Sequence, residues 1–149
     1  MTAQAIGFIG LGDMGYPMAK RLLEHGFTVV SCAHRRREAI EALKPDGLVE
    51  VENPAAVAQH AELVFTIVLD AQQTDRVLHG EDGVLGTLPR GGVIVIMSTL
   101  TPSYCSDLAA ALTEREISVL DCPVSGGSTG AQRGTDVPRR PGRQPRRPA

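Results

Sequence analysis

Short apolar runs alternate with amphipathic stretches along most of the chain. The runs that favour strands are Ala5–Ile9, Thr28–Val30, Leu63–Leu69, Val93–Met97 and Ile117–Leu120. Apolar residues recur at helical spacing between them, at Met18, Ala19, Leu22 and Leu23, at Ile40 and Leu43, and within Asp75–Leu78 and Ser103–Glu114. Strands that alternate with helices in this way predict βαβ units. We therefore expect an α/β fold with a doubly wound parallel sheet and helices on both of its faces.

Composition narrows the class of protein. The chain has 149 residues, too few for two confident domains, and its 42% hydrophobic and 21% charged residues are typical of a globular protein. Cys32, Cys105 and Cys122 show no CxxC spacing, which argues against a disulfide framework or a zinc site and favours a reducing compartment. No signal peptide is recognisable, and the longest apolar run is far shorter than the roughly 20 residues of a membrane span. We expect a soluble, cytoplasmic protein without a membrane partner.

Charge divides the chain into an acidic body and a basic tail. Residues 1–134 hold ten Lys and Arg against sixteen Asp and Glu, whereas residues 135–149 hold five Arg and one Asp. An acidic body argues against nucleic acid as the partner. The tail is rich in Pro and Arg and almost without apolar residues, so we expect one folded domain at 1–134 and a disordered tail at 135–149. Its two Pro-Arg-Arg-Pro units leave open a polyproline-type ligand or a nonspecific nucleic-acid contact.

A glycine-rich loop follows the first predicted strand and opens the first predicted helix. It reads Gly10-Leu11-Gly12-Asp13-Met14-Gly15, a GxGxxG pattern. In a Rossmann fold these glycines allow a tight turn, a close backbone approach to a pyrophosphate, and tight packing of helix on strand. The free N–H groups and the positive dipole end of the helix then face the phosphates. The sequence predicts a dinucleotide site; an ordinary glycine-rich turn is the alternative.

The end of the second predicted strand indicates which dinucleotide is bound. An acidic residue there would bind the ribose hydroxyls of NAD. The chain instead has His34, Arg35 and Arg36, and no carboxylate occurs between Ser31 and Arg37. Guanidinium groups can pair with a 2′-phosphate and stack on adenine, which favours NADP, with NAD as the alternative. A solvated basic turn that opens the next helix would also explain these residues.

Three ordered motifs resemble the β-hydroxyacid dehydrogenase family, which includes 3-hydroxyisobutyrate dehydrogenase and tartronate semialdehyde reductase. Residues 7–19 are similar to its opening signature, Met97-Ser98-Thr99-Leu100-Thr101-Pro102 to its Ser-Thr-x-x-Pro turn, and residues 121–131 to its substrate-binding segment. The resemblance covers residues 5 to about 135. It implies an N-terminal NAD(P)-binding domain of an oxidoreductase that acts on a small 3-hydroxy acid or its semialdehyde. Members of the family oligomerise, and the sequence does not indicate the state of this chain.

The resemblance also implies roles for individual residues. Val68, Leu69 and Gln73 would lie along the cofactor, although the family usually has Leu-Pro at the first two positions. Thr99 would lie near the nicotinamide ribose. The substrate carboxylate would be held by Ser125, Gly126 and Gly127, since a hydroxyl and two unobstructed amides can bind an anion. Without the resemblance, a packing threonine and a structural glycine turn would be favoured.

The family's proton-transfer lysine lies in a Gly-x-x-x-Lys motif that this chain lacks. Its two lysines are Lys20 and Lys44, both in the cofactor half. We therefore expect a catalytically incomplete chain with little or no turnover, or alternatively a non-catalytic NADP-binding module or pseudoenzyme. Asp136–Arg140 can be coded by GAC GTT CCT CGT CGG, and reading one base later gives Thr-Phe-Leu-Val, similar to the family's continuation. A frameshift near Thr135 would explain the tail and the missing lysine.

Overall fold

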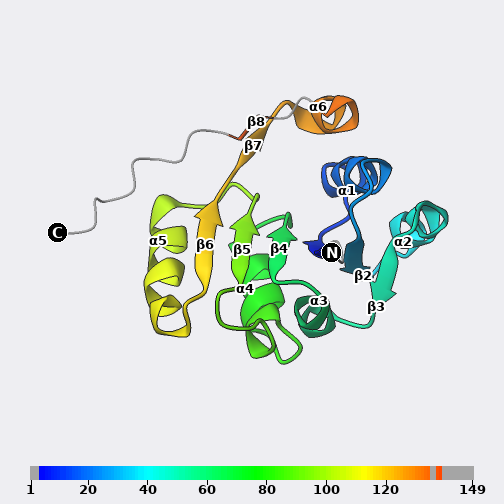
Figure 1. Ribbon diagram of the computed structural model, residues 1–149. Helices are drawn as coiled ribbons and strands as arrows, with labels where there is room; N and C mark the ends of the chain where they lie inside the picture. Colours follow the sequence, from blue (N-terminus) through cyan, green and yellow to red (C-terminus); the bar gives the residue numbers. More distant parts are fainter. Residues whose placement is uncertain (1–3, 135–136, 139–149) are drawn as a thin grey trace.

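A six-stranded parallel sheet forms the centre of the molecule (Figure 1). The computed structural model describes residues 4–134 and 137–138. The strands are β1 (Ile6–Ile9), β2 (Val29–Cys32), β3 (Val49–Val51), β4 (Leu63–Thr66), β5 (Val93–Ile96) and β6 (Ser118–Asp121). Their order across the sheet is β3-β2-β1-β4-β5-β6, so the direction of winding reverses between β1 and β4. The doubly wound α/β fold predicted from the alternating pattern is confirmed.

Helices cover both faces of the sheet. They are α1 (Gly15–Glu24), α2 (Glu38–Leu43), α3 (Pro54–His60), α4 (Ala71–His79), α5 (Pro102–Ala111) and α6 (Gly127–Arg133), with short 3-10 helices at Lys44–Asp46, Val84–Gly86 and Thr113–Arg115. Each face of the sheet packs against its helices through its own buried cluster. The first joins strand residues to α1 and α2 and comprises Phe8, Ala19, Val29, Ile40, Leu43 and Leu48. The second lies under α3, α4 and α5, with Val57, Leu78, Ile94 and Leu108 among its members.

Side-chain caps fix where three helices begin, all after strands of the sheet. Asn53 accepts a hydrogen bond from the N–H of Ala56 at the start of α3, and Asp70 accepts one from Gln73 at the start of α4, both at 2.8 Å. Thr101 caps α5 through the N–H of Tyr104. Each cap satisfies one of the N–H groups that a helix start leaves without a partner. The cap of α4 follows β4 and lies at the carboxyl edge of the sheet.

The edge of the sheet at β3 differs from the sequence prediction. Neither β3 nor α3 was among the predicted elements, and β4 ends at Thr66 rather than at Leu69. β3 is a three-residue edge strand whose Val49 is exposed, so it lacks the long apolar run that marks the central strands. The Asn53-Pro54 pair was the available signal for α3, since it combines a capping residue with proline in the first turn.

The last described segment turns back over the sheet. Strand β7 (Val124–Ser125) pairs antiparallel with β8 (Val137–Pro138), and α6 packs against α1 (Figure 1). The predicted disordered tail, 135–149, lies outside the described residues apart from 137–138. Within the described part of the chain, no helix has both the length and the apolar character that crossing a bilayer requires.

Candidate cofactor-binding site

The glycine loop between β1 and α1 is held in place by backbone contacts that exclude any side chain. Gly10 has a φ of 101°, in the left-handed region, and a Cβ on it would collide with the carbonyl oxygen of Ile67 after β4. A Cβ on Gly15 would collide with the carbonyl oxygen of Gly10. The loop is therefore folded back on itself and pressed against the end of β4. Glycine is required at both positions for the fold itself.

Gly12 is different, because it faces open space. Its chain neighbours aside, no heavy atom of the described residues lies within 4 Å of the place where a Cβ on Gly12 would stand. Gly12 and Asp13 are exposed at the start of α1. That start has no side-chain cap and no acidic residue in its first turn. A cradle of backbone N–H groups with a positive helix dipole behind it fits the pyrophosphate of a dinucleotide, both in space and in charge.

The turn after β4 forms a second wall of the site, and Ser98 holds it. The Ser98 hydroxyl accepts a hydrogen bond from the N–H of Val68 at 3.0 Å and donates one to the carbonyl oxygen of the same residue at 2.7 Å. Ser98 follows β5 and is 5% exposed. One hydroxyl thus ties the carboxyl end of β4 to that of β5. The sequence motif contained Ser98 but gave no indication of this role, which depends on a residue 30 positions away.

Further hydrogen bonds lock the same turn. The N–H of Leu69 donates to the side-chain oxygen of Gln73 at 3.1 Å, and the cap from Asp70 fixes the backbone of Gln73. Leu69 is 81% exposed, with its side chain directed away from the core. Gln73 therefore shapes the turn with its oxygen, and a direct contact with the cofactor stays a prediction for it. Thr99, directly after Ser98, is exposed at the same edge.

The basic turn after β2 forms the third wall. His34, Arg35 and Arg36 are all exposed, and among the described residues no hydrogen bond or ion pair is formed by their side chains. Arg37 differs, because Glu41 and Glu50 both bind its guanidinium. Burial, with a further contribution from Glu50, raises the pKa of the Cys32 thiol at the end of β2 to about 11. This thiol is protonated at neutral pH, so it offers no negative charge at this wall.

The segment predicted to hold the substrate carboxylate lies between β7 and α6. Gly126 and Gly127 have φ angles of 120° and 65°, which few other residues adopt, and both are exposed. Because α6 packs on α1, this segment returns to the helix that begins at the glycine loop. Ser125 precedes the two glycines in β7. Its role toward a substrate stays a prediction.

The remaining thiols are not activated. Burial raises the pKa of Cys105 to about 11, and the Asp121 carboxylate, which it hydrogen-bonds, adds to this. Burial and Asp121 also raise the pKa of Cys122. Across residues 4–134, no group of three metal-binding side chains comes together. The described part of the site therefore offers backbone amides, hydroxyls and the exposed side chains of Asp13, His34, Arg35 and Arg36.

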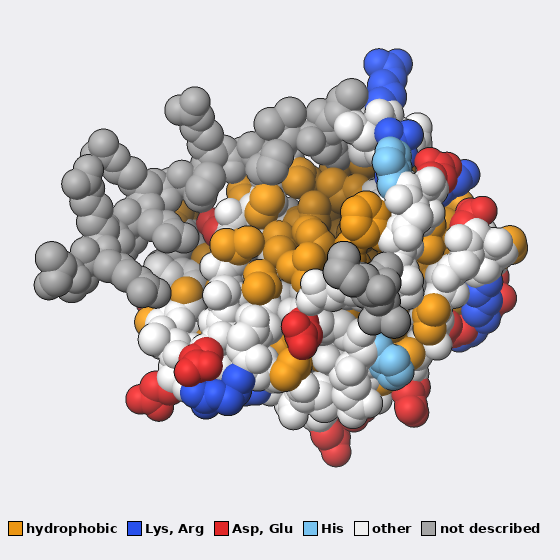
Figure 2. Space-filling view, in the orientation of Figure 1, with side chains coloured by type: hydrophobic (Ala, Val, Ile, Leu, Met, Phe, Trp, Pro, Cys, Tyr) orange, Lys and Arg blue, Asp and Glu red, His pale blue; other side chains and the backbone are white. Residues whose placement is uncertain are grey.

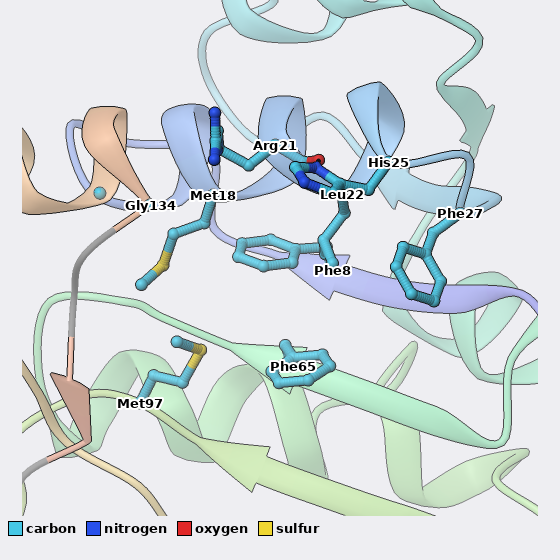
Figure 3. Close-up of a pocket in the computed structure, with 10 residues that line it drawn as sticks. Phe8, Met18, Arg21, Leu22, His25, Phe27, Phe65, Met97 and Gly134 are labelled. Carbon is cyan, nitrogen blue, oxygen red and sulfur yellow. Dashed lines mark hydrogen bonds between the residues drawn. The ribbon is translucent and has the colours of Figure 1, made fainter.

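A separate apolar pocket of about 360 Å³ lies between α1 and the sheet. The pocket is lined by Phe8, Met18, Leu22, Phe27, Phe65 and Met97, with Arg21, His25, Ala131 and Gly134 (Figure 3). Phe8 and Phe65 stack with their centroids 5.9 Å apart. Figure 2 shows hydrophobic side chains gathered in a hollow over the upper middle of this view. No residue of the glycine loop lines this pocket, so it is not the phosphate cradle.

The strand order reverses between β1 and β4, and the glycine loop lies beside this point, at a helix start without a side-chain cap. This arrangement defines a dinucleotide-binding Rossmann domain. A model of the family described as the NAD binding domain of 6-phosphogluconate dehydrogenase matches residues 5–137. The chain belongs to this family.

Curated relatives agree with the resemblance to the β-hydroxyacid dehydrogenases. The chain is 42% identical over 131 residues to 2-(hydroxymethyl)glutarate dehydrogenase of Eubacterium barkeri and 36% identical over 129 residues to L-threonate dehydrogenase of Cupriavidus necator. Each alignment covers 87% of this chain and 43% of the relative. The chain thus spans less than half the length of the relatives it matches.

Solved structures show the same partial correspondence. A 3-hydroxyisobutyrate dehydrogenase from Salmonella typhimurium is 29% identical and superposes with a TM-score of 0.83, over 91% of this chain and 47% of its own. Psf3 in complex with NADP+ and 2-OPP is 33% identical with a TM-score of 0.80, over 87% of this chain and 45% of its own.

Replacement of Ser98 by Ala tests the wall after β4. We expect Ser98→Ala to lower the free energy of unfolding by about 1–3 kcal/mol, because the N–H of Val68 loses its buried partner. We also expect weaker binding of a reduced nicotinamide cofactor, because the turn is no longer held. Urea unfolding and a fluorescence titration measure the two effects.

Ser31→Ala is the matched control. Ser31 is fully buried in β2, and its hydroxyl has no hydrogen-bond partner among the described residues. We expect little change in stability or binding. Equal losses in the two variants would contradict a specific role for the Ser98 hydrogen bonds.

Proposed function

We propose that this chain is the NADP-binding domain of an oxidoreductase that acts on a small 3-hydroxy acid or the matching semialdehyde. The observation that carries the proposal is the open cradle at Gly12, together with Arg35 and Arg36 after the neighbouring strand β2, whose side chains have no partner among the described residues. Backbone amides suit the pyrophosphate, and guanidinium groups suit the extra phosphate of NADP. The folded domain in this proposal is residues 1–134. The cytoplasmic location remains a prediction.

Each wall would make its own contribution to binding. The N–H groups at the start of α1 would hold the pyrophosphate, and Arg35 and Arg36, with His34 beside them, would hold the adenosine end. The turn at Val68 and Leu69 would exclude water along one side of the cofactor, while Thr99 would orient the nicotinamide ribose. The bound nicotinamide would supply hydride transfer. The chain's own task is thus to bind and orient.

The substrate class rests on the relatives and on one segment. The relatives are named as dehydrogenases of hydroxy acids, including L-threonate and 2-(hydroxymethyl)glutarate. A substrate of this class carries a carboxylate, and the exposed amides of Gly126 and Gly127 with the hydroxyl of Ser125 suit such an anion. We propose that this segment binds the carboxylate.

A non-catalytic NADP-binding module is the second candidate. Lys44 is one of two lysines in the chain, and it is engaged by Glu41 and Glu50 away from the glycine loop. Lys20 lies on α1 next to Tyr16, Glu24 and Gln132. Neither has the setting of a proton-transfer group at Ser125–Gly127. NADPH-dependent reduction of a small semialdehyde by the chain alone would rule this candidate out.

Substitution of Gly12 tests the cradle. We expect Gly12→Ala to weaken NADPH binding by roughly tenfold or more, because its methyl group fills the space in which the pyrophosphate approaches the backbone. We expect the free energy of unfolding to change by less than about 1 kcal/mol, since the new Cβ meets no described side chain. NADPH fluorescence and thermal unfolding measure the two effects.

Gly86→Ala is the control for this substitution. A Cβ on Gly86 would also meet open space, and Gly86 lies before β5, away from the glycine loop. The Gly86→Ala variant should bind NADPH as the unchanged chain does. If Gly12→Ala binds equally well, the cradle is not the phosphate site.

Cofactor preference follows from the basic turn. We expect the double variant Arg35→Ala/Arg36→Ala to weaken NADPH binding by about 10- to 100-fold, because charge-assisted hydrogen bonds to the 2′-phosphate are lost. NADH, which lacks that phosphate, should bind almost unchanged. Competitive titration with both cofactors measures the ratio.

Arg76→Ala controls for the loss of positive charge, since Arg76 is exposed on α4 on the other face of the sheet. It should leave both affinities as they are. A parallel loss of NADPH and NADH in the double variant would argue for a general role of the turn and against 2′-phosphate recognition.

A further inference from the structure

Arg37 is the third arginine of the basic turn, and its guanidinium contacts two carboxylates. Its Nη1 atom lies 2.8 Å from Oε1 of Glu50, and Nη2 donates to Oε2 of the same carboxylate at 3.0 Å. The Nη2 atom also lies 2.9 Å from Oε1 of Glu41. Two parallel hydrogen bonds from a guanidinium to one carboxylate fix its orientation as well as its position.

Lys44 closes these contacts into a ring. Its Nζ atom lies 2.9 Å from Oε1 of Glu41 and 2.8 Å from Oε2 of Glu50. Arg37, and after it Lys44, lowers the pKa of Glu50, while Lys44 and then Arg37 lower the pKa of Glu41. All four groups are therefore charged at neutral pH. The network holds two cations and two carboxylates, and its net charge is zero.

The network connects the turn after β2 with α2 and β3, at the end of the sheet where the adenosine of a cofactor would lie. Arg37 directly precedes α2 and directly follows Arg35 and Arg36. Glu50 lies in β3, which pairs in parallel with β2 so that Glu50 stands opposite Ser31. Figure 1 shows β2, β3 and α2 next to one another at this edge. The exposed fraction of the Glu50 side chain is 21%, so its charge is only partly screened by solvent.

We infer that this ion-pair network determines the preference for NADP over NAD, in two ways. It neutralises Glu41 and Glu50, two carboxylates that bind Arg37 of the arginine turn, where an uncompensated negative charge repels a 2′-phosphate and suits a free ribose. It also anchors Arg37 to β3 and α2, which fixes the backbone that presents Arg35 and Arg36 before the cofactor binds. The inference rests on the proposed binding of NADP.

Removal and restoration of charge balance test this inference. Lys44→Met leaves the network with a net charge of −1 and keeps an unbranched side chain of nearly the same length. We expect NADPH to bind roughly three- to tenfold more weakly, because the excess charge repels a phosphate that carries up to two negative charges, whereas NADH should bind within about twofold of the unchanged chain. In Glu41→Gln/Lys44→Met the network is neutral again, and we expect the ratio of NADPH to NADH affinity to return to that of the unchanged chain.

Arg90→Met is the matched control. Arg90 pairs with Glu116 at 2.9 Å on the exposed surface before β5, at the other end of the strands. Like Lys44→Met, this variant removes one cation that pairs with a carboxylate, so its thermal unfolding shows what such a loss costs away from the arginine turn. It should not change the ratio of NADPH to NADH affinity.

The outcomes separate the inference from the proposed function. If the unchanged chain binds NADPH no better than NADH, the proposed cofactor is wrong, and the inference fails with it. If the unchanged chain prefers NADPH but Lys44→Met keeps that preference, the inference alone is overturned. A proportional loss of both cofactors, or a double variant that does not recover the ratio, also overturns it, because either result indicates a structural role only.

Discussion

The close approach of the glycine loop to the end of β4 is the constraint on which the site depends. Side chains at Gly10 or Gly15 would collide with backbone carbonyls, so the chain can turn from β1 into α1 at this point only without them. This turn directs the start of α1 toward the carboxyl edge of the sheet. Because β1 and β4 are neighbours at the reversal of strand order, the same contact opens the crevice between the two halves of the fold.

The three walls of the crevice are each held by a different kind of interaction. Backbone packing fixes the glycine loop, buried neutral hydrogen bonds from Ser98 fix the turn after β4, and exposed ion pairs anchor the turn after β2. These interactions differ in their response to conditions. Salt screens the ion pairs and hardly affects the other two kinds of interaction, so the turn after β2 is the wall whose geometry depends on ionic strength.

The sequence predicted the central strands and β6, but it missed β3 at one edge of the sheet and α3 after it. Long apolar runs such as Val93–Met97 mark buried strands directly, whereas β3 is short, lies at an edge and exposes Val49, so no periodicity revealed it. In the candidate site, the glycine loop could be identified because its pattern is local. The role of Ser98 could not, since its partner Val68 is 30 residues away and meets it only through the pairing of β4 with β5.

The basic turn shows why residue type alone does not reveal a role. Three successive arginines carry the same charge, and the sequence offered two interpretations for them, a phosphate site and a solvated helix start. In the structure the three arginines differ in their partners. Arg37 lies at the start of α2 with two carboxylates bound to it, while Arg35 and Arg36 project without such partners among the described residues. A cation already paired has little left to offer a ligand, so the engagement of Arg37 leaves the proposed recognition of a phosphate to the two residues before it.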